Sequence, residues 1–440
     1  MELKEKLISS FVAFEQGLKG EHDCLHNIRL EGLETFENKG FPSKKEEAWK
    51  YTSLNSVLKN EFCVQPKKEV AIEYKDVKKY FLSDSDTFKL VFINGVFSSH
   101  LSETTHDNGF DVCLMSAALT KPKYKMVIDN YYNQAADKSD SLTALNTAYA
   151  VEGAYINVPK STVVSKPIEI IYLSTVEDQA LLVQPRNLIV VGENAHVQIL
   201  ERHQSISECS IFTNSVTEIF AHKRAICDFY KLQNDLDTGT LIDNTFIKQK
   251  QESRVSVHTF SFGGKLTRNN LNFYQDGERI DSTLKGITLI GGKQHVDHYT
   301  LVSHNQPNCE SHQDYKGLYN DNSVGVFNGK IYVDKIAQKT DGFQQSNNIL
   351  LSDKAVVYTK PQLEIFADDV KCSHGCTIGQ LDEEAMFYLR QRGIPKKEAK
   401  ALLMYAFTDD VMKSVKIPEL KSKVAKVIAD KLGVSMGFEI

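Results

Sequence analysis

Between about residues 155 and 375 the chain contains no helix of normal length, only short β-type runs separated by polar turns rich in Gly, Asn and Asp. A β region of this length restricts the architecture to a large sandwich, a propeller or a β-solenoid. A propeller requires a blade repeat of about 40–45 residues, and the sequence shows none. A solenoid tolerates weak repeats, because each coil only has to stack on its neighbours. The spacing therefore favours a β-helix over a sandwich.

Several of these runs alternate apolar and polar residues, which is the period of a strand with one buried face. In one of them Val255 and Val257 alternate with Ser256 and His258. The expected strands of the region are Ile168–Tyr172, Leu188–Val191, His196–Leu200, Val255–Phe260, Ile287–Ile290, Val324–Val326, Lys330–Val333, Val356–Thr359 and Gln362–Phe366.

Helical patterns flank the β region on its N-terminal side. In the first 60 residues apolar side chains recur at helical spacing, at Leu3, Leu7, Phe11 and Phe14. A second helical pattern covers Ser141 to Ala150. Trp49 is the only tryptophan, and we expect it to pack the N-terminal arm onto the β body.

Three amphipathic helices are expected at the C-terminal end, beginning near Asp382, Pro395 and Pro418. The apolar stripe of the second helix is Ala399, Leu402, Leu403, Ala406 and Phe407. The stripe of the third helix is Leu420, Val424, Val427, Ile428 and Leu432. These stripes need an apolar partner, which either the β body or another protein supplies.

Charge and targeting signals exclude several classes of function. Lysine and arginine number 52 and aspartate and glutamate 57, a net charge of −5, so the bulk basic surface of a nucleic-acid or anionic-membrane binder is missing. No stretch approaches 18 uncharged apolar residues, and no transmembrane helix is expected. The N-terminus lacks the layout of a secretory signal and the eight cysteines are scattered, so we expect reduced thiols in a cytoplasmic protein.

The sequence lacks the common enzyme motifs. Lys265, Lys293 and Lys330 each follow a glycine but lack the Ser or Thr that completes a phosphate loop. No GxGxxG follows a strand, and HExxH, GxSxG and CxxC do not occur. We therefore expect no catalytic activity as an ATPase, a Rossmann-type oxidoreductase or a zinc protease.

One cluster of possible metal ligands contains His295, His298, His304, Cys309 and His312. These donors suit a transition metal. However, His295 and His298 would point to opposite faces of a strand, because side chains alternate with period two. A metal site and ordinary surface histidines both remain open here.

A second cluster lies in the segment 367–377, where Cys372 and His374 are two residues apart. On an extended segment they share a face and can act together as thiolate and imidazole ligands. Lys371 and a nearby imidazolium can lower the pKa of the thiol. In the alternative interpretation this segment is a chain reversal, with Cys372 buried as a small hydrophobe.

Short motifs along nearly the whole chain occur together in a known family. They are the segments 40–42, 47–52, 92–95, 185–188, 327–331, 337–341, 350–352, 360–365, 367–375, 387–390 and 392–394. In these segments the sequence resembles the SufB/SufD family, the scaffold proteins of the SUF iron–sulfur cluster assembly system. Within the family it favours SufD, because the Cys-rich N-terminal motif and the acidic residue beside the histidine that SufB relatives tend to carry are absent.

The resemblance implies a mainly β chain, with a right-handed parallel β-helix core between N-terminal and C-terminal helical regions. We expect these units over residues 1–88, 89–380 and 381–440. The resemblance further implies a complex in which the chain pairs with SufB through the β-helix ends and binds the ATPase SufC through its C-terminal helices. The expected SufC contacts are Leu402, Leu403, Ala406 and Phe407. A homodimer in isolation is also compatible with the resemblance.

By resemblance, a transient iron–sulfur cluster forms at the interface with SufB. The functional histidine of the family falls on His374 and the neighbouring cysteine on Cys372, which become the candidate iron or cluster ligands. Cys376 stands where the family usually has a small residue, and it is either a neutral substitution or an added ligand. The assembled complex can carry a flavin, but we expect this chain alone to bind no cofactor.

Two other classes of function stay open as alternatives. In one the chain is a purely architectural β-helix partner, with His374 and Cys372 as packing residues. In the other it is a β-helix carbohydrate-active enzyme, which requires a carboxylate pair in a groove. The adjacent Asp368 and Asp369 would face opposite ways on a strand and cannot form that pair.

Overall fold

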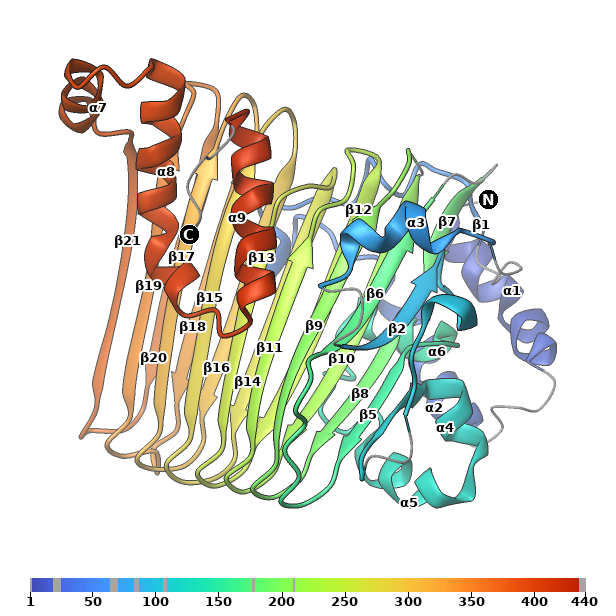
Figure 1. The fold of residues 1–440 in the computed structure, drawn as a ribbon. Helices are drawn as coiled ribbons and strands as arrows, with labels where there is room; N and C mark the ends of the chain where they lie inside the picture. The colour runs from blue at the N-terminus through green and yellow to red at the C-terminus, as the bar shows by residue number, and fades with distance from the viewer. Residues whose placement is uncertain are drawn as a thin grey trace.

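Two long parallel sheets form the body of the protein (Figure 1). The computed structural model describes residues 2–18, 25–63, 70–82, 87–105, 109–175, 179–208 and 210–434. The first sheet has the order β20 (Val356–Ile365), β18 (Val324–Val333), β16 (His295–His304), β14 (Leu266–Gln275), β12 (Gly239–Gln249), β10 (Ile211–Ala221), β8 (Arg186–Val191), β5 (Ala154–Val158) and β4 (Asp111–Leu114). The short strands β1 (Phe62–Cys63) and β7 (Ala180–Val183) join its side.

The second sheet has the order β21 (Lys371–Gln380), β19 (Asp341–Leu350), β17 (Glu310–Tyr319), β15 (Asp281–Ile290), β13 (Arg254–Ser261), β11 (Ile226–Gln233), β9 (His196–Ser205), β6 (Ile168–Ser174), β2 (Phe88–Ile93) and β3 (Val96–Phe97). From β8 onward successive strands alternate between the two sheets, so the chain winds through a β-helix of about 8 turns. The predicted fold class, a mainly β chain with a parallel β-helix between helical regions, is confirmed.

The coils follow one another at a nearly constant spacing. The strands β14, β16, β18 and β20 begin at intervals of 29, 29 and 32 residues, and each pairs in parallel with the strand one coil away. Equivalent positions nevertheless carry unlike side chains, such as His298, Phe327 and Thr359 in consecutive coils. This explains why the sequence shows no repeat motif although the backbone repeats.

The space between the sheets is apolar along one part of the strands and polar along another. In the second sheet one inward-facing row contains Ile199, Phe229 and Val257, and the row two residues further along the strands contains Glu201 and Lys231. All five side chains are fully buried. Alternation along each strand directs these side chains into the interior, as the sequence pattern predicts.

Four charged or titratable side chains meet in this interior. The Lys231 ammonium lies 2.6 Å from Asp243 Oδ2 and 3.9 Å from Glu201 Oε1, and His203 Nε2 lies 3.4 Å from that same Glu201 oxygen. Burial by itself would raise the pKa of Glu201, but Lys231 and His203 outweigh it and hold this pKa below its usual value. The cluster thus neutralises its own charge, and removing one member leaves an uncompensated charge in the core.

We predict that Lys231→Met lowers the free energy of unfolding by about 3–5 kcal/mol, because Asp243 and Glu201 lose their cation in a fully buried site. Urea unfolding followed by circular dichroism measures this. The control is Lys160→Met, which breaks the exposed ion pair with Glu193 and is expected to leave the free energy of unfolding nearly unchanged. Equal losses in the two variants would contradict this assignment.

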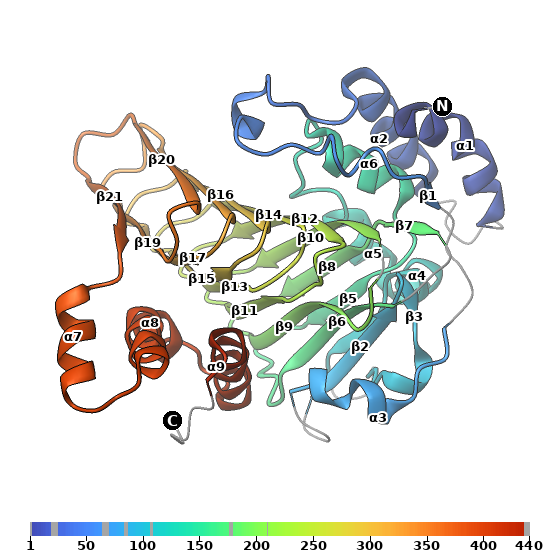
Figure 2. The ribbon, with the colours of Figure 1, turned by 90° about the horizontal axis from the view of Figure 1, so that it is seen from above.

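Helices cover the outer faces of both sheets (Figure 2). On the first sheet lie α1 (Leu3–Gly17), α2 (His26–Lys39), α4 (Met115–Thr120), α5 (Pro122–Tyr131) and α6 (Ser141–Tyr149). On the second sheet lie α8 (Lys396–Lys413) and α9 (Pro418–Leu432), while α3 (Tyr74–Val77) lies nearer the N-terminal coils. Among the described residues no helix is long and apolar enough to cross a membrane.

A buried arginine attaches the N-terminal helices to the first coils. Arg186 Nη2 lies 2.6 Å from Glu218 Oε1, and its Nη1 donates to Thr147 Oγ1 on α6 at 3.1 Å. Glu218 also accepts backbone N–H groups of Asn133 and Ala135 at 2.8 Å. The conspicuous Pro185–Leu188 motif of the sequence therefore has a structural role in this protein.

Trp49 anchors the N-terminal segment to the first sheet, as predicted. It is buried, and the Arg268 guanidinium lies 4.1 Å from its ring centroid. The same segment reaches the last coil, where the rings of Tyr51 and Tyr358 stack with centroids 4.3 Å apart. The N-terminal segment thus contacts the first sheet from β14 to β20.

The apolar stripe predicted for the second C-terminal helix lies mostly outside the contact of that helix with the β body. The residues of α8 that are buried are Ala399, Ala401, Met404, Thr408, Val411 and Met412. Of the predicted stripe only Ala399 is buried, whereas Leu402, Leu403 and Phe407 are half-buried and Ala406 is exposed. The helix has apolar residues on more than one side, so spacing alone does not reveal which side faces the sheet.

Candidate functional site

The last coil of the β-helix is open. The strands β20 and β21 are the ends of their sheets, and within the described residues no strand pairs with their outer edges. Figure 2 shows this open end on the side away from the N-terminal helices. Large apolar side chains are exposed on or beside the last coil: Phe343, Val356, Tyr358, Ile365, Phe366 and Ile378. Unpaired edges and exposed apolar groups together are typical of a docking surface.

The candidate ligands lie on this open coil. Cys372, His374 and Cys376 of β21 pair with Gly342, Gln344 and Ser346 of β19, which are the inward-facing positions of that strand. All three side chains therefore belong to the inward face of the last coil. Spacing predicted the shared face of Cys372 and His374, and the register extends it to Cys376.

Strand geometry limits which of the three can bind one metal ion. Residues two apart on a strand have Cα atoms about 6.6 Å apart, so His374 can share an ion with either cysteine. Cys372 and Cys376 are about 13 Å apart by the same spacing. Since a thiolate binds at about 2.3 Å, the two cysteines cannot bind the same ion without moving the strand.

The two thiols differ in what surrounds them. Cys372 packs against the apolar cluster that contains Ile331 and Leu363, whereas Cys376 interacts with Thr359 on the facing strand β20. Burial raises the pKa of both thiols above the ordinary value for cysteine. Lys371 therefore does not produce the lowered thiol pKa that the sequence suggested. His374 between them is exposed.

We predict slow alkylation of Cys372 and Cys376 by iodoacetamide at pH 7, because a raised thiol pKa leaves little thiolate. Raising the pH through 9 should increase both rates steadily. Mass spectrometry of the peptides, with N-acetylcysteine as the reference thiol, measures this. Reaction at pH 7 faster than the reference would show that a neighbouring group lowers the pKa instead.

The cluster from His295 to His312 does not converge. His295 faces outward, where Nε2 lies 3.0 Å from Thr52 Oγ1, and His298 faces inward, where Nε2 lies 2.9 Å from Thr288 Oγ1. Burial lowers the pKa of His298 to about 4, and this histidine stays neutral at physiological pH. The opposite orientation predicted for this pair is what the structure has, and the five residues form no common ligand set.

One other group, Glu201, His203 and Asp243, has ligand atoms close enough together for a metal ion. However, the Lys231 ammonium already supplies the cation there, at 2.6 Å from Asp243. The carboxylates of this group are therefore neutralised by a side chain of the protein itself, and we interpret the group as part of the core.

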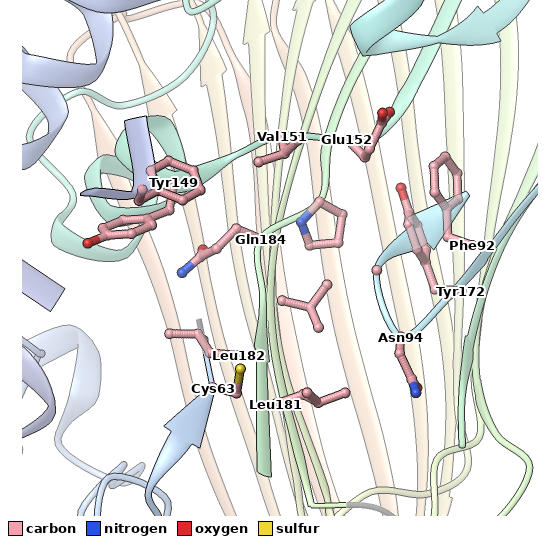
Figure 3. Close-up of a pocket in the computed structure, with 14 residues that line it drawn as sticks. Cys63, Phe92, Asn94, Tyr149, Val151, Glu152, Tyr172, Leu181, Leu182 and Gln184 are labelled. Carbon is pink, nitrogen blue, oxygen red and sulfur yellow. The ribbon is translucent and has the colours of Figure 1, made fainter. Parts of the chain in front are cut away.

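Figure 3 shows a cavity near the first coils, away from the open end. Phe92 and Tyr172 stand on one side of it and Cys63, Leu181 and Leu182 on another. The hydroxyl of Tyr172 donates to Asn187 Oδ1 at 2.7 Å. The lining of the cavity is mainly apolar. It includes none of the candidate site residues predicted from the sequence.

None of the six cysteines in the described ranges forms a disulfide, and Cys24 and Cys209 lie outside these ranges. The aspartates Asp368 and Asp369 lie in the exposed turn between β20 and β21 rather than on a strand. Two residues at the open end were not predicted from the sequence: Thr359 on β20 and Gln344 on β19. The pairing of strands about 30 residues apart places Gln344 beside His374, and Thr359 meets Cys376 from the facing strand of the last coil.

These features define a class of protein: a parallel β-helix whose outer faces are covered by helices and whose last coil is open and carries inward-facing cysteine and histidine. Comparison with known proteins agrees with this class. Residues 173–407 match the family model described as SUF system FeS cluster assembly, SufBD core domain, and residues 1–170 match the SufBD protein N-terminal region. The chain belongs to the SufB/SufD family.

Similar proteins of the family cover almost the whole chain. An iron–sulfur cluster assembly SufBD family protein of Synechocystis sp. is 31% identical over 93% of this chain and 89% of its own length. The iron–sulfur cluster assembly protein SufD of Escherichia coli is 28% identical over 89% of this chain and 90% of its own length. SufD of Bacillus subtilis is 26% identical over 93% of this chain and 94% of its own length.

Proposed function

We propose that this chain is a non-catalytic scaffold subunit of a SufB–SufC–SufD complex, in which a transient iron–sulfur cluster is assembled at the open end of the β-helix. The observation that carries the proposal is the inward-facing set Cys372, His374 and Cys376 on a coil that no further coil covers. The cluster is the cargo of the complex, and a flavin in the assembled complex is part of the same proposal.

The open end supports pairing with a SufB-type chain. A second β-helix docked end to end would supply hydrogen-bond partners to the edges of β20 and β21 and cover the exposed Phe366 and Ile378. His374 and one thiol provide two ligands, and tetrahedral iron takes four. The remaining ligands would come from the partner or from sulfide. In isolation two copies of this chain can cover each other in the same way.

The C-terminal helices support the docking of SufC. The helix α8 buries one side against the second sheet and leaves Leu402, Leu403 and Phe407 half-buried and Ala406 exposed. The helix α7 (Glu383–Gln391) has no buried residue, and its Phe387 and Tyr388 are exposed. The exposed and half-buried apolar residues of α7 and α8 thus form a surface that another subunit can contact.

A point of attachment lies where the C-terminal helices meet the sheet. Lys416 Nζ donates to the buried carboxylate of Asp228 at 2.8 Å, and its backbone N–H donates to the Tyr230 hydroxyl at 3.1 Å. Movement of α8 and α9 by the ATPase would therefore act on β11, in the middle of the β-helix. We propose that this movement opens the SufB–SufD interface through a rigid-body change.

We predict that His374→Ala lowers iron and sulfide loading of the reconstituted complex by about tenfold or more, because a metal ligand is lost. The control is His312→Ala, an exposed histidine on the outer face of β17. Loading is measured by iron and acid-labile sulfide assays after gel filtration. Wild-type loading in the His374 variant would favour the purely architectural alternative.

We predict that Ala406→Arg weakens the complex with SufC by about tenfold or more, because a long charged side chain enters the proposed contact. The exposed position keeps the fold intact, so the thermal unfolding midpoint should stay unchanged. Met126→Arg, at an exposed position of α5, is the matched control. If size exclusion gives the same complex for both variants, the contact lies elsewhere.

The carbohydrate-active alternative has little support. Asp368 and Asp369 lie together in one exposed turn. A glycosidase instead places two carboxyl groups across a groove at about 5–10 Å from each other. We also propose a cytoplasmic location, in keeping with the reduced thiols that the cargo chemistry requires.

A further inference from the structure

Gln344 is a buried amide that stands out from the rest of the interior. Its side chain is fully buried, and neither its Nε2 nor its Oε1 has a hydrogen-bond partner among the described residues. One coil further in, Gln313 is in register with it, and the Nε2 of Gln313 also lacks a partner. An unpaired buried amide atom is costly, and each case in a native structure needs a reason.

Among the amides deeper in the β-helix, Asn214, Asn244 and Gln275 each have one unpaired polar atom, and others are fully paired. Gln233 Nε2 donates to Asn269 Oδ1 at 2.5 Å, and Gln233 Oε1 accepts from Ser261 Oγ at 2.7 Å. Asn187 Nδ2 donates to Glu201 Oε2 at 3.1 Å. The amide with both polar atoms unpaired is therefore near the open end, in the coil next to the candidate ligands.

The register places Gln344 directly beneath His374. The two residues are paired across β19 and β21 and belong to the same inward-facing row. Gly329 on the facing strand β18 makes room for the amide, because a Cβ on this glycine would lie 2.1 Å from Gln344 Nε2. A side chain there would displace the amide group, so the space across the interior is fitted to Gln344.

We propose that Gln344 is a binding residue for the iron–sulfur cargo, donating its amide N–H to sulfide or thiolate sulfur at the open end. Sulfide is an anionic hydrogen-bond acceptor. The buried amide N–H of Gln344 can donate to it only when the cargo is present. Hydrogen bonds to sulfur stabilise the charge on a cluster and raise its reduction potential. The proposal rests on the function proposed above and names one further residue of that same site.

The stability of a variant separates this role from a structural one. Gln344→Leu removes two unpaired polar atoms and keeps an apolar body of similar size, so the thermal unfolding midpoint of the chain should stay the same or rise. The matched variant is Gln233→Leu, which removes a satisfied amide from the same interior. Its midpoint should fall, because Ser261 and Asn269 lose a partner.

In the reconstituted complex, Gln344→Leu should shorten the lifetime of the assembled cluster against a chelator by about tenfold, the effect of one hydrogen bond to a charged acceptor. The reduction potential of the cluster should shift to a more negative value. Gln344→Asn keeps the amide on a shorter side chain and should recover part of the lifetime.

The outcomes separate the two proposals. If His374→Ala shortens the cluster lifetime and Gln344→Leu changes neither lifetime nor potential, this inference is wrong and the proposed function stands. A fall in the unfolding midpoint of Gln344→Leu with unchanged cluster properties also overturns it, because the amide is then structural. If neither variant affects loading or lifetime, the proposed function itself fails.

Discussion

Backbone hydrogen bonding between coils is the constraint on which the rest of this structure depends. Each strand pairs in parallel with the strand one coil before it and the strand one coil after it, from β8 to β19 in the two sheets. Helices cover the outer faces, but the edges of β20 and β21 keep backbone groups on which another strand can pair. The open coil therefore follows from the architecture itself, and it makes this end the natural place for a second protein.

The same winding decides what the interior can hold. Inward-facing rows bring together side chains that are one coil apart, so a lysine, two carboxylates and a histidine can neutralise one another around Lys231. Near the open end Gln344 is left with both polar atoms of its amide unpaired. This amide lies in the coil next to the one that carries the candidate ligands.

The sequence predicted local features and missed those that depend on register. Alternation with period two was enough to predict the β body, the opposite directions of His295 and His298, and the shared face of Cys372 and His374. The partners of Lys231 and the position of Gln344 beneath His374 were not predictable, because coil length sets which residues meet. The side of α8 that faces the sheet was not predictable for a related reason: the helix is apolar on more than one side, and tertiary contact selects the buried one. The division of the chain at residues 88 and 380 stays a prediction.

We propose that the open coil, with His374 on its inward face, is the surface where a SufB-type partner completes the assembly site. Hydrogen–deuterium exchange of this chain, with and without that partner, measures whether this surface is covered. We expect new protection of backbone N–H groups in 356–365 and 371–380, with little change in the strands and helices at the other end. Protection confined to the N-terminal helices, with the amides of β20 and β21 still exchanging rapidly, would contradict it.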